Sequence, residues 1–309
     1  MRSIPKTVII MTTYNGEKFI EKQLNSLKNQ TYKNFEVAIL DDCSTDNTVS
    51  IIEAFIKRNQ LSNWYLTINP KNLGWKKNFI EGSKNNLKDF VFFCDQDDIW
   101  IENRIEKMID EMVNNNNINV LVTNYKIIDS NDEVTKVHKY FKKDLSIERI
   151  KFNGKNLNVQ RPGCSYCVRG NFLEKILGYW QEDYAHDSLV WKSALVTQSL
   201  YIYNYYSLLY RRHDNNASGS NLSNNKIIAL SKSEINHLKL LIGYVLENSS
   251  DKSDQIIEKI QKAINFHEMR YEAYQKRSIS RIIMCGLKFF SYFPSWKYII
   301  TDTKRIMNK

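Results

Sequence analysis

The stretch Phe90-Val91-Phe92-Phe93-Cys94-Asp95-Gln96-Asp97-Asp98 decides the fold. Its apolar half predicts a strand buried on both faces, which is typical of a parallel sheet covered by helices. Its acidic half follows where the strand ends, and unpaired carboxylates placed so close together would repel one another. A hard divalent cation such as Mg²⁺ or Mn²⁺ relieves that repulsion, so Asp97 and Asp98 are candidate metal ligands. The alternative is a solvated acidic turn that caps a helix starting near Ile101.

Outward from this stretch, the first 125 residues alternate strand-like and helix-like segments. That alternation predicts an α/β fold, a Rossmann-like, mostly parallel sheet flanked by helices. The predicted strands are 7–12, 35–41, 64–68, 90–94 and 120–124. The predicted helices between them are 18–29, 45–59, 75–87 and 101–114, with Ser44 or Thr45 as the N-cap of the second.

Polar clusters follow three of these strands. Thr13, Tyr14 and Asn15 come after the first strand, and Asp41 ends the second. Ligands of such sheets bind at the carboxyl ends of the strands, so we expect these clusters to meet the acidic stretch. Asp41 could accept the imide hydrogen of a uracil or thymine ring, and Tyr14 could supply a ring face. For Asp42 and the residues that follow it, helix capping is the alternative.

The rest of the chain is less regular and then helical. A helix-like run at 187–196 precedes a predicted strand pair at 200–210, and apolar stripes after residue 225 predict a helical extension. We therefore divide the chain into 1–225, with halves 1–125 and 126–225, and a basic C-terminal extension, 226–309.

The net charge and its distribution limit the classes of partner that the protein could bind. A net charge of +10 suits nucleic acid, an anionic membrane or a phosphorylated substrate. From Lys276 onward there are eight Lys or Arg residues against one acid, Asp302, and no nucleic-acid motif accompanies them, so we predict no nucleic-acid partner.

Five cysteines without a framework fit a reducing compartment, and we interpret the Cys164 and Cys167 pair as structural. The start of the chain carries only a short apolar run, at 8–11, so we expect no export signal and a cytoplasmic location.

Four ordered motifs resemble those of the family 2 inverting glycosyltransferases with the GT-A fold, particularly the bacterial rhamnosyltransferase-like branch. The motifs are Thr13-Tyr14-Asn15, Asp41-Asp42-Cys43-Ser44-Thr45-Asp46, Asp95-Gln96-Asp97-Asp98-Ile99-Trp100, and His186-Asp187 with Tyr210-Arg211-Arg212-His213-Asp214-Asn215-Asn216. The resemblance extends to about residue 220. It implies a metal-dependent transferase that uses Mn²⁺ or Mg²⁺, with 1–125 as the nucleotide-sugar half and 126–225 as the acceptor half.

Carried over residue by residue, the resemblance assigns a role to each motif. It implies that Asp187 is the catalytic base, which takes the proton from the acceptor hydroxyl. It implies that Asp97 and Asp98 serve the metal and that His213 adds a contact to the metal or to the diphosphate. The donor-binding residues would be Thr13, Tyr14, Asn15 and Asp41 at the base, Asp95 near the ribose, and the cations Lys76, Arg211 and Arg212 near the diphosphate. For His186-Asp187, a helix N-cap with a flanking histidine is the alternative.

Two residues depart from the family pattern. Cys43 stands where many relatives carry Gly, so the turn after Asp42 must avoid a positive φ or accept strain. His186 replaces the Glu that precedes the base in many relatives. The Gln-x-x-Arg-Trp motif of processive synthases is absent, which favours a transferase that adds single sugars.

The predicted helix at 279–290 is amphipathic and basic. Its apolar face would consist of Ile279, Ile282, Ile283, Leu287 and Phe290, with Arg277, Arg281 and Lys288 opposite. This face either lies on the inner face of the cell membrane or packs on the catalytic domain or a partner subunit.

The resemblance favours dTDP-rhamnose as the donor, with UDP-hexoses open. It implies a lipid-linked saccharide acceptor in the synthesis of a cell-surface polysaccharide such as O-antigen or capsule. The alternatives are a sugar-nucleotide nucleotidyltransferase, which would need a Gly-rich phosphate loop where this chain has only Gly16, and a non-catalytic GT-A binding module.

Overall fold

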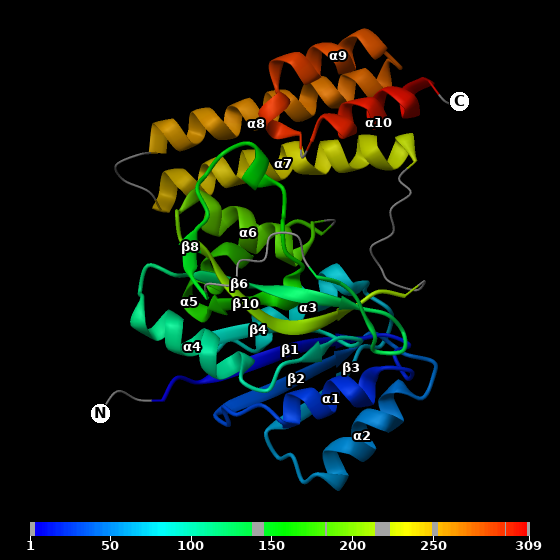
Figure 1. Ribbon diagram of the computed structural model, residues 1–309, viewed down its shortest axis with the longest axis vertical. Helices are drawn as coiled ribbons and strands as arrows, with labels where there is room; N and C mark the ends of the chain where they lie inside the picture. The colour runs from blue at the N-terminus through cyan, green and yellow to red at the C-terminus, as the bar shows by residue number, and fades with distance from the viewer. Residues whose placement is uncertain are drawn as a thin grey trace.

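A computed structural model describes residues 4–137, 145–182, 184–213, 223–248, 253–293 and 295–307. Figure 1 shows a central sheet with helices on both faces and a further layer of helices, α7 to α10, stacked on one side. The α/β fold predicted from the sequence is confirmed, and so is the helical C-terminal region.

The sheet has the strand order β3-β2-β1-β4-β9-β6-β10-β5. Strands β1 to β4 pair in parallel, whereas β9 is antiparallel to both of its neighbours. The strands are β1 (Thr7–Thr13), β2 (Phe35–Asp41), β3 (Trp64–Ile68), β4 (Phe90–Asp95), β5 (Ile99–Trp100), β6 (Val120–Ile128), β7 (Val134–Val137), β8 (Ile147–Arg149), β9 (Tyr166–Arg169) and β10 (Leu200–Arg211).

The five strands expected in the first 125 residues are all present, at nearly the expected bounds. The strand pair expected at 200–210 is wrong, because β10 is one long strand. Its parallel pairing with β6 shifts register on either side of Tyr206, so the irregularity lies inside one strand and does not separate two.

Helices cover the two faces of the sheet because successive strand residues point to opposite sides. Val8 and Ile10 face the core formed with α3 (Trp75–Asn85), α5 (Gly170–Leu177) and α6 (His186–Val196), and α7 (Asn224–Asn248) and α8 (Ser253–Gln275) extend this core. Ile9 and Met11 face the opposite core, formed with α1 (Ile20–Lys28), α2 (Thr48–Arg58) and α4 (Arg104–Asn114). The N-cap predicted for the second helix is wrong, because Asn47 occupies that position.

Strand register brings the polar clusters together. Thr13 pairs with Asp41 across β1 and β2, and Thr12 pairs with Asp95 across β1 and β4. The expected meeting of these clusters at one edge of the sheet is therefore confirmed.

The C-terminal helices are α9 (Ile279–Lys288) and α10 (Trp296–Met307), and both contact α8. The contact with α8 buries one residue of the predicted apolar face of α9 and leaves the others exposed. Ile282 is buried against Ala273 and Tyr274, so it does not share a surface with the other four apolar residues. Those four remain exposed, by 37% for Ile279, 49% for Ile283, 82% for Leu287 and 56% for Phe290. Among the described residues, no helix is both long enough and apolar enough to cross a membrane.

A buried ion pair fixes α10 to α8. Arg270 donates two hydrogen bonds to the Asp302 carboxylate, at 2.7 and 3.0 Å, and the Tyr274 hydroxyl donates a third at 2.7 Å. Asp302 has no exposed surface. Removing one partner of such a pair leaves an uncompensated buried charge.

We therefore expect Asp302→Ala to lower the free energy of unfolding by about 3–5 kcal/mol, measured by chemical denaturation. The matched control is Glu258→Ala, which breaks the exposed Glu258–Lys262 pair on α8 and should cause no measurable change. Equal effects of the two substitutions would contradict the stabilising role of the buried pair.

Candidate functional site

A cavity of 460 Å³ opens at the carboxyl ends of β1, β2 and β4. Six of the residues singled out from the sequence line it, namely Thr13, Tyr14, Asp95, Asp97, Asp187 and His213. They come from both halves of the chain, since Asp187 begins α6 and His213 follows β10. The sheet edge and α6 thus face one shared space.

Asp41 supports this cavity from behind and does not line it. Its carboxylate is fully buried and accepts hydrogen bonds from the Thr13 hydroxyl at 2.7 Å, the Ser44 amide at 2.7 Å and the Ser44 hydroxyl at 2.6 Å. These contacts join the ends of β1 and β2. Asp41 therefore holds Thr13 in place at the cavity wall.

Asp42 lines the cavity, a position that helix capping does not explain. Its carboxylate accepts from the amides of Leu73 and Gly74 at 2.7 and 2.8 Å and from the Asn69 side chain at 3.0 Å. It thereby holds the loop before α3 against the end of β2. The sequence motif contained Asp42, but the sequence could not separate a role in the site from helix capping. The contacts of Asp42 with the loop before α3 separate them.

Gln96 fixes the loop that carries Tyr14. Its side chain accepts from the Tyr14 amide at 2.8 Å and donates to the Tyr14 carbonyl at 3.0 Å, as a neighbouring strand would. The Tyr14 side chain is 46% exposed at the cavity mouth. Sequence reasoning missed Gln96 because its partner is a backbone group, which no pattern of side chains reveals.

The turn after Asp42 accepts backbone strain. Cys43 adopts φ 65°, in the left-handed region that favours glycine. Asn15 also has a positive φ, 46°, and its side chain accepts from the Thr45 amide at 2.9 Å. Asn15 thus ties the first loop to the second, and it does not line the cavity.

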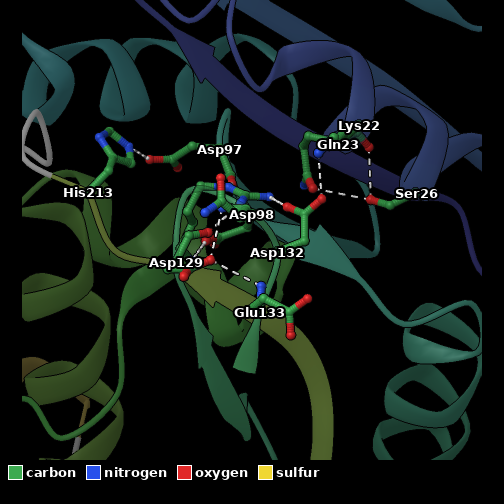
Figure 2. A network of polar contacts seen from close by, with 11 residues as sticks. Lys22, Gln23, Ser26, Asp97, Asp98, Asp129, Asp132, Glu133 and His213 are labelled. Atoms are coloured by element: carbon green, nitrogen blue, oxygen red, sulfur yellow. Dashed lines mark hydrogen bonds and ion pairs between the residues drawn. The ribbon is translucent and has the colours of Figure 1, made fainter. Parts of the chain in front are cut away.

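Asp95 and Asp97 present carboxylates to the cavity. Figure 2 shows Asp97 and His213 pointing toward one another, with 2.8 Å between the Asp97 carboxylate and His213 Nε2. Burial raises the pKa of Asp95 to about 7, and repulsion from Asp97 and Asp187 adds to the effect. Asp98 lies deeper and does not line the cavity, and burial together with Asp97 and Asp95 raises its pKa well above the usual range.

The donor set fits a hard divalent cation at the cavity edge. Carboxylate oxygens of Asp95 and Asp98 and the Cys164 sulfur lie within 4.8 Å of one another. Burial holds the pKa of the Cys164 thiol well above its usual range, so the thiol is a poor ligand for Mg²⁺ or Mn²⁺. Asp95, Asp97 and His213 are the set that faces the cavity. A bound cation would relieve the crowding that raises the pKa values of Asp95 and Asp98.

Arg211 lies behind the carboxylates, fully buried. Its amide donates to Asp98 at 2.9 Å, and its guanidinium donates to the carbonyls of Asp97 and Asp129, both at 2.7 Å. It also forms an ion pair with Asp132, in the polar network of Figure 2. Arg211 therefore positions the acidic loop and is turned away from the cavity that a donor would occupy.

The other two predicted cations lie outside the cavity lining. Arg212 stacks over the Tyr210 ring at 5.0 Å, and Lys76 lies 5.9 Å from the Trp75 ring. Tyr210 and Trp75 themselves line the cavity, so both cations border it. The motif residues Asp214, Asn215 and Asn216 fall outside the described residues.

Asp187 faces the carboxylate cluster from the first turn of α6. Burial raises its pKa to about 6, an effect partly offset by the Ser188 amide, which donates to its carboxylate at 2.7 Å, and by Lys192 and Lys76. A carboxylate with this pKa is ionised near neutral pH and still basic enough to accept a proton. Its placement depends on Gly163, where a Cβ would lie 2.4 Å from His186 Nε2 and 3.2 Å from Asp187 Cβ.

His186, the residue before Asp187, is buried and also lines the cavity. Its ring packs against Phe79 and Phe93, with centroids 4.1 and 4.7 Å away. Burial lowers its pKa to about 3, so the ring is neutral. Neither ring nitrogen has a hydrogen-bond partner among the described residues.

Comparison with known proteins connects this geometry to a family. The family model described as "Glycosyl transferase family 2" matches residues 8–184. The dTDP-rhamnosyl transferase RfbG of Shigella flexneri is 32% identical over 229 residues, which cover 69% of this chain and 75% of that protein.

A second sequence comparison and a structural comparison agree with this family. The UDP-Glc:alpha-D-GlcNAc-diphosphoundecaprenol beta-1,3-glucosyltransferase WfgD of Escherichia coli is 38% identical over 130 residues, covering 41% of this chain and 49% of that one. Among solved structures, residues 1–349 of TarS from S. aureus, in complex with UDP-GlcNAc, align with a TM-score of 0.66 at 19% identity. That alignment covers 97% of this chain and 89% of the other, so the fold likeness includes the C-terminal helices.

Proposed function

The chain belongs to glycosyl transferase family 2 and is a glycosyltransferase, and from this premise we propose that it moves a sugar from a pyrimidine nucleoside diphosphate sugar to a saccharide hydroxyl. One observation carries the proposal. Asp95, Asp97 and His213, suited to a cation and a diphosphate, face the same cavity as Asp187, whose raised pKa suits a base. A donor bound between them would have its anomeric carbon exposed to an acceptor activated by Asp187.

The nucleotide would lie at the ends of β1 and β2. Thr13, Tyr14 and Asp42 line that part of the cavity, with the exposed Tyr14 ring available for stacking on the base. Asp41 and Asn15 then act indirectly, by holding Thr13 and the Tyr14 loop. Arg211 likewise serves as a positioning residue for Asp97 and Asp98.

Asp95, Asp97 and His213 would hold Mn²⁺ or Mg²⁺, with Asp98 behind them. When bound, the cation supplies positive charge that stabilises the diphosphate as a leaving group. Lys76 and Arg212, at the border of the cavity, add to that positive field.

In the transfer itself, the acceptor oxygen attacks the anomeric carbon as the bond from that carbon to the diphosphate oxygen breaks. The hydroxyl proton passes to the Asp187 carboxylate, and the nucleoside diphosphate leaves with the bonding electrons. Attack from the side opposite the leaving group inverts the anomeric configuration. Because Asp187 and the metal-binding set lie on different elements around the cavity, they can flank the sugar from two sides.

The relatives guide the choice of substrates. RfbG is named for dTDP-rhamnose and WfgD for a UDP-glucose donor and a diphosphoundecaprenol-linked GlcNAc acceptor. We therefore propose dTDP-rhamnose or a UDP-hexose as donor and a lipid-linked saccharide as acceptor. The reaction would serve cell-surface polysaccharide synthesis, in the cytoplasm at the inner face of the membrane.

A thermal-shift experiment tests the function. The melting temperature is measured with UDP, dTDP and GDP, each with and without Mn²⁺. We expect UDP or dTDP to stabilise the protein only when Mn²⁺ is present, since the metal-binding residues and the nucleotide pocket are adjoining parts of one cavity. No nucleotide-dependent shift under any condition would overturn the proposal.

The membrane contact would be made by exposed apolar residues of α9 and of the turn that follows it. They are defined here as the α9 stripe: Ile279, Ile283 and Leu287 in α9, and Phe290 just after it. Exposed Arg277 and Lys288 flank it, which suits anionic lipid. We expect the protein to float with phosphatidylglycerol vesicles at low salt, and Leu287→Glu to release it. Leu246→Glu on α7, at a leucine that is 63% exposed away from the stripe, is the matched control. If Leu287→Glu floats with the vesicles as completely as the control does, the proposed membrane contact is contradicted.

A further inference from the structure

A second cavity, of 560 Å³, lies between the catalytic fold and the C-terminal helices. One wall is the segment 154–160 that follows β8, and the other walls come from α6, α7, α8 and the residues that join α9 to α10. Figure 1 shows the segment after β8 rising to the C-terminal helices, where the Asn158 side chain donates to the Tyr292 carbonyl at 3.3 Å.

This second cavity lies next to the first near Asp187, the proposed catalytic base. Ser188 lines the second cavity and Asp187, the residue before it, lines the first. The segment that lines the second cavity at 154–160 also continues to Pro162 and Gly163, which line the first. Lys192 in the second cavity is near enough to Asp187 to lower the pKa of that carboxyl.

The lining suits a ring that carries hydroxyl groups, because it combines aromatic surface with polar side chains. Phe266, Tyr292 and Tyr298 supply aromatic surface. Lys192 forms an ion pair with Glu234, so its charge is compensated within the cavity wall. Burial lowers the pKa of His267 to about 4, which leaves this ring neutral.

His267 also offers a polar atom that a ligand could bond. Its Nδ1 is buried without a hydrogen-bond partner among the described residues, although the ring lines an open cavity. A buried polar atom without a partner costs free energy, and a ligand hydroxyl would satisfy it.

We propose that this second cavity binds the acceptor saccharide, so that the sugar hydroxyl reaches Asp187 from the side of the C-terminal helices. The inference rests on the proposed function. It gives α7, α8 and α10 a part in acceptor recognition, through Glu234, His267 and Tyr298.

The test measures binding of methyl glycosides of glucose, rhamnose and N-acetylglucosamine by saturation-transfer NMR, on the full chain with UDP and Mn²⁺. We expect at least one glycoside to bind, and Tyr298→Ala and His267→Leu each to weaken it by about five-fold through loss of a stacking surface or a hydrogen bond. Tyr271→Ala on α8, outside this lining, is the matched control and should leave the affinity unchanged.

Unchanged glycoside affinity in both cavity variants would overturn the inference, as would absence of glycoside binding by a wild type that binds UDP with Mn²⁺. UDP affinity is measured in parallel and should be equal in all variants. A wild type that binds glycosides but no nucleotide would instead remove the proposed transferase and leave the saccharide cavity standing.

A different observation carries a second inference, about His186. The neutral ring offers one donor and one acceptor, and both nitrogens are buried and unpartnered while the ring lines the first cavity. Nε2 points toward Gly163, where even a methyl group would collide with it at 2.4 Å. The glycine therefore lets the ring pack directly against the backbone at that nitrogen, on the wall of the cavity.

We infer that His186 binds a hydroxyl of the sugar being transferred and helps to select it. The residue adjoins Asp187, so a group that reaches its ring lies beside the anomeric carbon and away from the nucleotide. This inference too rests on the proposed function. In the free protein the two unpartnered nitrogens are a cost to stability that the bound sugar would remove.

His186→Leu tests this with an unusual pair of outcomes. The melting temperature should rise, because a buried polar group without a partner is replaced by an apolar one. Affinity for whichever of UDP-glucose, UDP-N-acetylglucosamine and dTDP-rhamnose the wild type binds should fall by up to about ten-fold, while affinity for UDP or dTDP with Mn²⁺ stays the same.

His237→Leu is the matched control, because both His237 nitrogens are also buried and unpartnered among the described residues, but the ring stacks on Tyr184 at 3.6 Å, outside the first cavity. It should raise the melting temperature and leave sugar-nucleotide affinity unchanged. Equal losses for sugar nucleotide and free nucleotide in His186→Leu, or no loss of either, would overturn the role of His186.

Discussion

Asp187→Asn is expected to lower turnover by about 10²–10⁴-fold while the affinity for the nucleotide with Mn²⁺ stays unchanged. The amide has nearly the same shape as the carboxylate but cannot accept the acceptor proton. The measurement is release of nucleoside diphosphate in the presence of acceptor, with nucleotide affinity determined separately. Asp110→Asn, at an exposed carboxylate on α4, is the control and should be fully active. Turnover within a few-fold of wild type in Asp187→Asn would show that another group takes the proton.

The same residue predicts the acid limb of the pH profile. Only the ionised carboxylate accepts a proton, and burial raises its pKa to about 6. Below that pH we expect turnover at saturating Mn²⁺ to fall about ten-fold per pH unit, and above it to level off. The residual activity of Asp187→Asn should lack this limb. A limb that persists unchanged in the variant would assign it to a different group.

Asp97→Ala is expected to abolish the stabilisation by nucleotide that depends on Mn²⁺ and to lower turnover by about 10²–10³-fold. Asp97 both faces the cavity and contacts His213, so its loss removes one ligand and a contact that orients another. Thermal shift with a titration of Mn²⁺ measures the first effect. Glu102→Ala, an exposed carboxylate shortly after the same loop, is the control and should bind Mn²⁺ and nucleotide normally. If nucleotide still stabilises Asp97→Ala with the Mn²⁺ dependence of the wild type, the metal does not bind at this loop.

Local patterns predicted the first 125 residues of the fold because each strand there carries its own signal. The run that ends in Cys94 is apolar throughout, and the residues that follow are polar, so strand, strand end and site could be located together. Parallel pairing then placed Thr13, Asp41 and Asp95 at one edge, as expected.

The second half depended on contacts between distant residues. Strand β9 is short, and it is a strand because β4 and β6 flank it, which no local pattern reveals. The strand pair predicted at 200–210 is the single strand β10, whose register against β6 shifts within the strand, and strand register depends on a partner distant in the sequence. The division of the α9 apolar face followed from α8 packing, which periodicity alone cannot predict.

In the site, residue types were predicted better than residue roles. Arg211 and Asp41 stand in the motifs as charged residues that could meet a ligand, yet burial turns both into supports. Asp42 and Gln96 line the cavity because backbone groups of distant loops come to them. His186 was noted only as a departure from a family pattern, and its unpartnered nitrogens became visible with the packing of Phe79 and Phe93.

The most direct test of the central claim is anomalous diffraction from crystals of the protein soaked with Mn²⁺ and UDP or dTDP. The account predicts a manganese peak within coordination distance, about 2.0–2.3 Å, of Asp95, Asp97 or His213 atoms, with the diphosphate bound to the same ion. Nucleotide bound elsewhere, or a manganese peak away from these side chains, would contradict it.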